Sequence, residues 1–255
     1  MPLTILFWNV RKNDGCRMSL VRLAKAEQVD VFLLAEAMPD LVSLVGELNL
    51  IGQGSYYEAS PGLSGKVIVV SRQASANLEL RRIDASEDMS IWRVAMPSAV
   101  ILLAAVHLPA PLGGVKETDQ HYWAQKLAEQ IAATEDSENC KATVLIGDLN
   151  MNPFHQGVVS ATGLHGLMTR DLARRPERVH RGQEFRRFYN PMWGLFGDRT
   201  DGPAGTYFLE SSAPSNHHWH ILDQVLLRSE LVDRLLVLSV LDSDRVESLL
   251  KNERP

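Results

Sequence analysis

Five polar residues stand at or just after the ends of short apolar runs that predict β-strands. They are Asn9, Glu36, His107, Asp148 and Asn150. Because the loops at strand ends converge over one edge of an α/β sheet, we expect these side chains to gather in one cleft. Hard divalent cations such as Mg²⁺ prefer oxygen ligands, and Glu36 and Asp148 supply carboxylate oxygens. The residue types therefore predict metal-assisted chemistry, and a phosphate group is the substrate that they suit.

Phosphodiester hydrolysis uses a set of this kind. A metal ion neutralises the phosphate, a carboxylate orients the attacking water, and donors stabilise the charge of the transition state. A lone Asp or Asn at a strand end is usually a turn or cap residue. Asp148 and Asn150, however, share a Gly-Asp-Leu-Asn context, and Glu36 follows a fully apolar run, where an unpartnered charge is costly. We therefore interpret these positions as functional.

The elements that must position these residues follow from the apolar periodicity of the chain. Strands are predicted at residues 4–10, 30–36, 66–71, 78–83, 91–96, 100–107 and 142–147, and later at 206–209, 219–227 and about 235–241. Helices are predicted at residues 19–28, 40–48, 117–134 and 154–160. A strand-rich middle between helical flanks predicts an α/β fold, a four-layer α-β-β-α sandwich with two mixed sheets face to face and helices outside. No linker divides the chain, so residues 1–255 read as one domain.

Several short segments occur in an order that resembles the exonuclease–endonuclease–phosphatase superfamily. That family includes pancreatic-type deoxyribonucleases, abasic-site endonucleases, sphingomyelinases and inositol polyphosphate 5-phosphatases. Each segment alone is weak, whereas the ordered set is specific and extends over most of the chain. The segments are 7–9, 35–36, 65–72, 106–108, 147–153 and 222–226.

The resemblance implies a role for each residue at the strand ends. Glu36 would be a metal ligand, and Asn9 beside it would contact metal-bound water or the phosphate. Asp148 would orient or deprotonate the attacking water, and Asn150 would hold the scissile phosphate. His107 falls where the family places a group that stabilises the phosphate or the leaving group. The implied cofactor is Mg²⁺ or Mn²⁺.

Asp223, in Ile221-Leu222-Asp223-Gln224, would pair in this family with a later histidine, and no histidine follows it in the sequence. His218 and His220 precede it on the same predicted strand and should point to the other face, while His217 would lie roughly 20 Å away along an extended strand. These histidines also match no familiar zinc spacing. We therefore expect a domain that lacks its C-terminal strand, with Asp223 facing no histidine.

A basic, aromatic insertion loop is predicted at residues 169–205. Between Arg170 and Arg187, seven arginines and three acidic residues give a net charge of about +4. The formal net charge of the chain, −5, provides no global attraction to a polyanion, so any such attraction must be local. We expect substrate phosphates and bases to meet this loop, although a solvated loop without specific contacts and a surface for anionic lipid remain open. The residues assigned to substrate binding are Arg186, Arg187, Tyr189 and Trp193.

The remaining features favour a protein of the cytoplasm. Cys16 and Cys140 match no metal or redox spacing and read as free thiols. The N-terminus does not resemble a signal peptide, and no run approaches the roughly 20 apolar residues of a membrane span.

Together these features favour a metal-dependent phosphodiesterase, and within that class a nuclease. Two alternatives stay open. One is a phosphatase or phospholipase C-type enzyme acting on a small or lipid phosphate, and the other is a phosphate-binding pseudoenzyme that lacks the C-terminal catalytic histidine expected to pair with Asp223.

Overall fold

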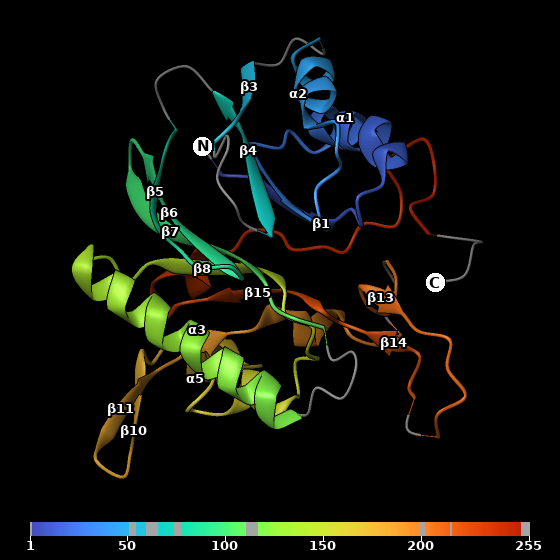
Figure 1. Ribbon diagram of the computed structural model, residues 1–255. Helices are drawn as coiled ribbons and strands as arrows, with labels where there is room; N and C mark the ends of the chain where they lie inside the picture. Colours follow the sequence, from blue (N-terminus) through green and yellow to red (C-terminus); the bar gives the residue numbers. More distant parts are fainter. Residues whose placement is uncertain are drawn as a thin grey trace.

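Two β-sheets lie face to face at the centre of the molecule, with helices on their outer sides (Figure 1). The structure is a computed structural model that describes residues 2–50, 55–59, 66–73, 78–110, 117–198, 202–214 and 216–250. The predicted α-β-β-α order of layers is confirmed. Gly65, in one of the family-like segments, and residues 199–201 of the predicted insertion lie outside the described residues.

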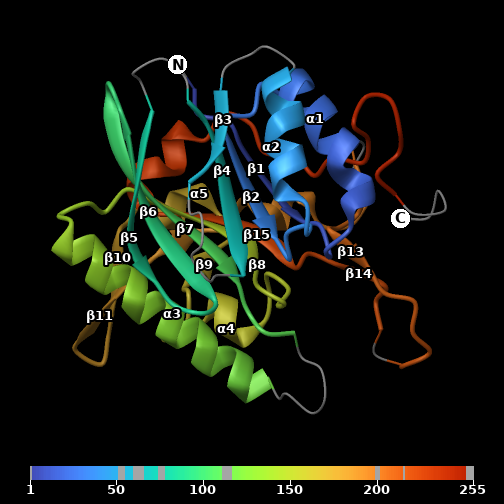
Figure 2. The same ribbon diagram turned by 45° about the horizontal axis from the view of Figure 1, so that its top comes forward.

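The first sheet has the strand order β1 (Ile5–Asn9), β2 (Val31–Ala35), β4 (Val67–Gln73) and β3 (Ser55–Glu58). β1 and β2 run parallel, and β4 runs antiparallel to both of its neighbours. Every residue of β2 is buried, as expected of an uninterrupted apolar run that is covered on both faces. The helices α1 (Arg17–Ala26) and α2 (Leu41–Leu50), which follow the short 3₁₀ helix η1 (Asp14–Cys16), pack side by side over its outer face (Figure 2).

The second sheet has seven strands, in the order β5-β6-β7-β8-β15-β12-β9. Their bounds are β5 (Glu79–Ala85), β6 (Met89–Met96), β7 (Ala99–His107), β8 (Thr143–Asp148), β15 (Asp223–Leu227), β12 (Phe188–Tyr189) and β9 (Gly166–Leu167). The long helix α3 (Glu117–Ser137) covers its outer face together with α4 (Gln156–Val159) (Figure 1). No helix in these described ranges is long and apolar enough to cross a membrane.

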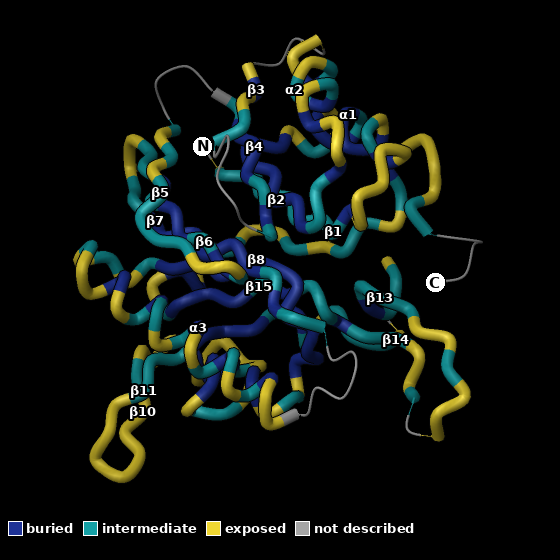
Figure 3. Tube along the Cα trace, in the orientation of Figure 1, coloured by how far each residue is buried: buried dark blue, intermediate teal, exposed yellow. Residues whose placement is uncertain are grey.

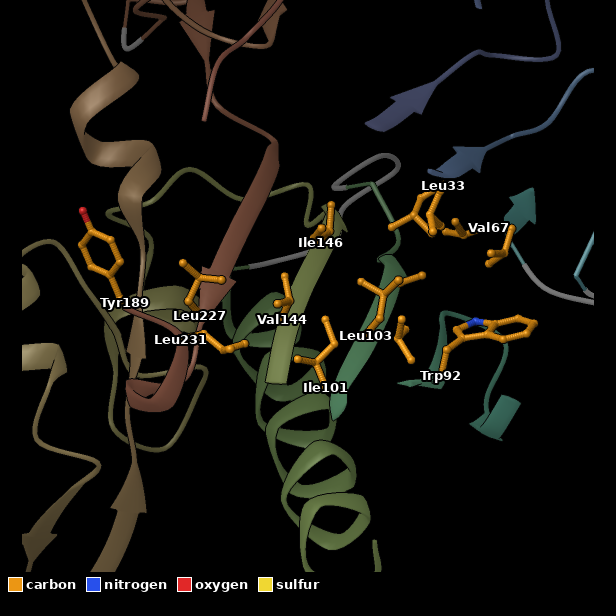
Figure 4. Packing of buried hydrophobic residues seen from close by; sticks show 14 of the residues in the cluster. Leu33, Val67, Trp92, Ile101, Leu103, Val144, Ile146, Tyr189, Leu227 and Leu231 are labelled. Carbon is orange, nitrogen blue, oxygen red and sulfur yellow. The ribbon is translucent and has the colours of Figure 1, made fainter. Parts of the chain in front are cut away.

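The main core lies between the two sheets. Leu33 and Val67 of the first sheet face Leu103, Val144 and Ile146 of the second (Figure 4). Two further apolar clusters fill the spaces under α1 and α2 and under α3. Full burial of one such side chain contributes roughly 1.5–3 kcal/mol to stability. The three apolar clusters lie between the four layers of the sandwich and hold them together.

Strand register brings the predicted strand-end residues to one edge. Asp148 lies opposite His107 of β7 and opposite Asp223 of β15. In the first sheet Asn9 lies opposite Ala35, and Glu36 follows directly. The strands β7 and β8 approach so closely here that a Cβ at Gly147 would stand 1.9 Å from the carbonyl oxygen of Val106. Only glycine fits at the position that precedes Asp148.

Residues 169–198 contain regular elements where the sequence suggested a loop. After α5 (Arg170–Ala173), a hairpin of β10 (Glu177–His180) and β11 (Gln183–Arg186) extends from the body, and its turn is exposed (Figure 3). The chain then returns through β12 into the seven-stranded sheet and through the 3₁₀ helix η2 (Pro191–Leu195). The insertion is therefore partly integrated into the fold.

Of the strand predictions for the last part of the chain, one is confirmed in part and one is wrong. Residues 219–227 form two strands, β14 (Trp219–His220) paired with β13 (Tyr207–Phe208) and β15 in the large sheet. Residues 235–241, which follow the 3₁₀ helix η3 (Ser229–Arg234), form no strand. Leu236 and Val237 are exposed there, so apolar character without a neighbouring strand did not produce one. Cys16 and Cys140 are free, as expected.

Candidate active site

Asn9, at the end of β1, connects the two sheets across the cleft. Its side-chain nitrogen Nδ2 donates to Glu36 Oε1 at 3.1 Å and to Asp148 Oδ2 at 3.2 Å. Its oxygen Oδ1 accepts the backbone N–H of Arg11 at 3.1 Å, which fixes the orientation of the amide. Asn9 thus holds two carboxylates together, and its amide oxygen faces the backbone in this arrangement.

His107, at the end of β7, reaches the same two carboxylates. Its Nε2 lies 3.9 Å from Glu36 Oε1 and 4.0 Å from Asp148 Oδ2. Its Nδ1 is buried and has no hydrogen-bond partner among the described residues. The ring is therefore placed between the carboxylates, where one nitrogen can meet a substrate oxygen.

Asp148 and Asn150 form a tight, buried turn. Asp148 Oδ1 accepts the backbone N–H of Asn150 at 2.9 Å, and Asn150 Nδ2 donates to the carbonyl of Leu108 at 2.8 Å. The carbonyl of Asn150 in turn accepts Nε2 of Gln120 on α3 at 2.6 Å. Because Asp148 Oδ1 is held by the turn, Oδ2 is the oxygen of Asp148 that meets Asn9 and His107.

The backbone around the cleft is strained at several positions. Arg11, Lys12, Glu36 and Asn150 have φ values of 49°, 54°, 45° and 50°, a left-handed conformation that is uncommon for residues other than glycine. The N–H of Lys12 donates to the carbonyl of Glu36 at 2.8 Å, which joins two of these turns. Such conformations cost on the order of 1–3 kcal/mol each and are concentrated at functional sites.

Asp223 stands beside Asp148 on the neighbouring strand. Burial of its carboxyl, followed by the negative charge of Asp148, raises the pKa of Asp223 to about 8. A hydrogen bond with Thr206 and the charge of Arg11 act in the opposite direction. Among the described residues, no histidine forms a hydrogen bond or ion pair with this carboxylate. Asp244, which follows Asp223 in the chain, pairs with Arg22 on α1 and not with a histidine.

Sequence reasoning missed several residues on the cleft wall. The guanidinium carbon of Arg11 lies 5.1 Å from the centre of the Tyr207 ring, within reach of the charge of Asp223. Asn152 Nδ2 donates to His220 Nδ1 at 3.0 Å, and Asn152 Oδ1 accepts the N–H of Ile221 at 2.9 Å. The signals were available: Arg11 is two residues after Asn9, and Asn152 is two residues after Asn150.

An aromatic group borders this wall. The Phe154 ring lies 6.4 Å from that of Trp193, 6.0 Å from that of Phe196 and 5.9 Å from that of His217. His217 is in turn 4.3 Å from His220, ring centre to ring centre. Burial, followed by the charges of His217 and His155, lowers the pKa of His220. Trp193, predicted to bind substrate, therefore lies near Phe154, which is four residues after Asn150 in the chain.

The other three residues predicted to bind substrate lie elsewhere. Tyr189 pairs with Leu227, the last residue of β15. Asp223 is the first residue of that strand, about 13 Å from Leu227. Arg186 is held by Glu135 at 2.9 Å and by Asp136 at 2.5 Å, both on α3. Arg187 continues the hairpin in the same region. The structure thus places Trp193 near Phe154 and places the other three residues away from Asp148 and Asp223.

The donor set of the cleft suits a hard divalent cation that keeps much of its water. Within the ranges that the structure describes, no group of three or more His, Cys, Asp or Glu side chains is placed to hold a metal ion. Mg²⁺ commonly takes only one or two carboxylates together with waters and substrate oxygens. Glu36, whose Oε1 already meets Asn9 and approaches His107, fits as such a carboxylate.

Comparison with known proteins gives a family and a fold. The family model described as Endonuclease/Exonuclease/phosphatase family matches residues 6–244. Truncated TDP2 from Caenorhabditis elegans is similar in structure, with 13% identity, a TM-score of 0.52, and coverage of 89% of this chain and 84% of that chain. TDP2 from D. rerio, complexed with single strand DNA product, has 14% identity, a TM-score of 0.51, and coverage of 89% and 83%.

The human Nocturnin catalytic domain with bound sulfate anion is a third similar structure. It has 14% identity, a TM-score of 0.52, and coverage of 89% of this chain and 82% of that chain. No curated protein matches the sequence. At these identities the structural likenesses show a shared fold.

Proposed function

The chain belongs to the Endonuclease/Exonuclease/phosphatase family, and from this premise we propose that it is a Mg²⁺- or Mn²⁺-dependent phosphodiesterase that cleaves nucleic acid. One observation carries the proposal: Asn9 binds Glu36 and Asp148 simultaneously, and His107 stands 4.0 Å or less from both. Residues from both sheets therefore meet where a phosphate and a metal ion can be held together.

Each group has a role that its contacts support. A divalent cation bound at Glu36 would supply charge neutralisation at the phosphate. Asp148 accepts a hydrogen bond from a water molecule at Oδ2 and orients it toward the phosphorus, while its Oδ1 remains fixed by the turn. His107 donates from Nε2 to a phosphate oxygen and stabilises the charge that develops there. Asn9 keeps the two carboxylates in place, and Asn150 fixes Asp148 from below.

Nucleic acid is the substrate class that the cleft wall favours. Phe154 and Trp193 form an aromatic border on which a base can stack, and such stacking contributes roughly 1–3 kcal/mol per base. Arg11 adds a cation on the Tyr207 ring. The D. rerio TDP2 structure of the same fold is complexed with single strand DNA product. A small or lipid-borne phosphate uses none of the aromatic border, which makes a phosphatase or phospholipase the weaker candidate.

A phosphate-binding protein without catalysis is the second candidate. It is favoured by one observation, the absence of a histidine against Asp223 among the described residues. Such a protein would bind the same ligands and release them unchanged. Loss of one acid–base group typically lowers a rate about 10²–10⁴-fold, so residual turnover separates an impaired enzyme from this candidate.

Cleavage assays test the proposal. We expect the wild-type chain with Mg²⁺ or Mn²⁺ to cut at least one of single-stranded DNA, double-stranded DNA and RNA, in preference to a lipid phosphodiester. Asp148→Asn should lower the rate about 10³-fold, because the amide cannot orient or deprotonate water as the carboxylate does. Binding without cleavage by the wild-type chain would favour the second candidate. A preference for the lipid phosphodiester would contradict the choice of substrate.

A further inference from the structure

The hairpin at the far end of the large sheet carries arginines that no acidic residue neutralises. We define the arginine surface as Arg175, Arg178 and Arg187. Within the described ranges, none of the three side chains forms an ion pair. The neighbouring arginines differ, because Arg174 pairs with Asp233 and Arg186 pairs with Glu135.

Hydrogen bonds hold the arginine surface together. The carbonyl oxygen of Leu172 accepts Nη1 of Arg187 at 3.0 Å and the backbone N–H of Arg175 at 3.3 Å. The backbone N–H of Arg187 donates to the carbonyl of Pro176 at 2.8 Å. Arg178 stands in register with Phe185, two residues before Arg187. These contacts bring Arg175 and Arg187 together at Leu172 and Pro176, and the hairpin register places Arg178 on the strand that pairs with the one before Arg187.

This collection is electrostatically unfavourable as it stands. Burial, followed by the charges of Arg175 and Arg178, lowers the pKa of Arg187. Burial, followed by the charges of Arg187 and Arg178, lowers the pKa of nearby His165 to about 4. Nε of Arg187 is buried and has no hydrogen-bond partner among the described residues. An anion at this place would relieve the repulsion and accept hydrogen bonds from the exposed guanidinium groups of Arg175 and Arg178.

The acidic residues of the hairpin do not fill this role. Glu177 lies 3.6 Å from Lys141, and Asp171 pairs with Arg174. Glu184 stands in register with Val179, one position along from the pair of Arg178 and Phe185. Because successive side chains of a strand point to opposite faces, Glu184 and Arg178 lie on opposite faces of the hairpin. The face that carries Arg178 therefore stays cationic.

We propose that the arginine surface binds the phosphate backbone of a nucleic acid strand outside the catalytic cleft. Guanidinium groups match phosphate oxygens in a two-donor geometry, which favours phosphate as the ligand. A nucleic acid strand touches only a local patch, whereas a broad anionic membrane would also face the net charge of −5 of the chain. The β10–β11 hairpin lies on the opposite side of the molecule from β13 and β14, so the surface supplies affinity and leaves the chemistry to the cleft (Figure 1).

Binding of a single-stranded oligonucleotide of about 30 nucleotides, longer than the cleft alone would cover, tests this proposal. The Asp148→Asn background keeps the strand intact. We expect Arg175→Ala together with Arg178→Ala to weaken binding roughly 20-fold at about 0.1 M salt. The slope of log affinity against log salt should fall by about 1.4, because two phosphate contacts are lost. Arg178→Ala alone should give about half of that change in slope.

Two controls separate a binding surface from a structural effect. Lys25→Ala, which removes an exposed cation in the last turn of α1, is matched to Arg178→Ala and should leave the slope unchanged. In the wild-type background, the double variant should hydrolyse bis(p-nitrophenyl) phosphate at the parental rate. It should unfold at or above the parental temperature, because two charges that repel Arg187 are removed. A parent that fails to hydrolyse this small ester would count against the proposed function, while the binding comparison would still stand.

Two results would overturn the proposal. One is an unchanged oligonucleotide affinity and salt slope in the double variant. The other is an unchanged oligonucleotide affinity combined with weaker binding to vesicles that contain phosphatidylserine, which would identify a lipid surface.

Discussion

The candidate active site gathers carboxylates, whereas the arginine surface gathers guanidinium groups. Each is a cluster of like charges, and the two clusters have opposite signs. In the cleft, Asp148 stands beside Asp223 and close to Glu36, and the pKa of Asp223 is raised by burial and by Asp148. On the hairpin, Arg175 and Arg178 lower the pKa of Arg187. Each cluster is incomplete by itself, so one fits a cation and the other fits an anion.

The two clusters are built with different precision. In the cleft, Asn9 joins the side chains of Glu36 and Asp148, and these residues stand at or just after the ends of strands in both sheets. On the hairpin, the arginines are held through backbone carbonyls, and Arg175 and Arg178 are exposed. Fixed geometry suits a reaction, whereas exposed charges on a hairpin suit a strand that varies in sequence and position.

The largest expected effect breaks the cleft alone. Glu36→Gln should lower the affinity for Mn²⁺ at least tenfold and nuclease activity about 10³-fold, because the amide replaces the carboxylate that fits the metal. Thermal unfolding with increasing Mn²⁺ measures the first change, since about 2.7 kcal/mol of stabilisation is expected at 100 times the dissociation constant.

The matched control for Glu36→Gln is Glu184→Gln, an equal change of charge on the hairpin. It should retain both the stabilisation by Mn²⁺ and the activity. Equal stabilisation of Glu36→Gln and of the parent by Mn²⁺ would show that Glu36 is not the ligand.

The next effect concerns stability beside the arginine surface. The pKa of His165 falls from its usual 6.5 to about 4 in the folded chain, so folding favours the neutral ring. The stability that depends on this ring is present above pH 6.5 and is lost as the pH falls toward 4, with a total of about 3 kcal/mol. His165→Asn should remove this acid-dependent loss, because asparagine tolerates the φ of 51° at this position and does not titrate there.

Urea unfolding at several pH values between 7 and 4 measures the effect of His165→Asn. His180→Asn, at an exposed position of the same hairpin, should leave the loss in place. An oligonucleotide bound to the arginine surface should reduce the loss in the parent, since bound phosphates offset the charges that act on His165. The same loss of stability in His165→Asn and in the parent would exclude His165 as its source.

The smallest effect tests the one cation that we place at the cleft wall. Arg11→Ala should lower kcat/KM on an oligonucleotide about tenfold, because a charge-assisted contact to the substrate is lost. Arg11→Lys should recover part of the rate. The salt slope of binding should change less than in Arg175→Ala with Arg178→Ala, because one contact is removed instead of two. Activity of Arg11→Ala equal to that of the parent would place Arg11 outside the reaction.

Much of the cleft was predictable from local sequence. Apolar runs of five to nine residues located β1, β2, β7 and β8, and the polar residue that ends each run was visible in the same window. The two-residue strands β9, β12, β13 and β14 were not predicted at those bounds, because so few residues carry no periodicity. Nor did the sequence indicate that residues 219–227 bend into two sheets, which removed the basis for placing His220 by alternation.

The sequence by itself determined which chemical groups stand at the ends of the strands, because a strand and the residue that follows it are neighbours along the chain. Only the tertiary structure decided which charges meet and which are neutralised. Arg186 and Arg187 are adjacent and look equivalent, yet Arg186 is paired with Glu135, 51 residues earlier, while Arg187 lies among other arginines. Ion pairs between distant segments depend on how sheets and helices pack, and that packing is set by the apolar layers between them.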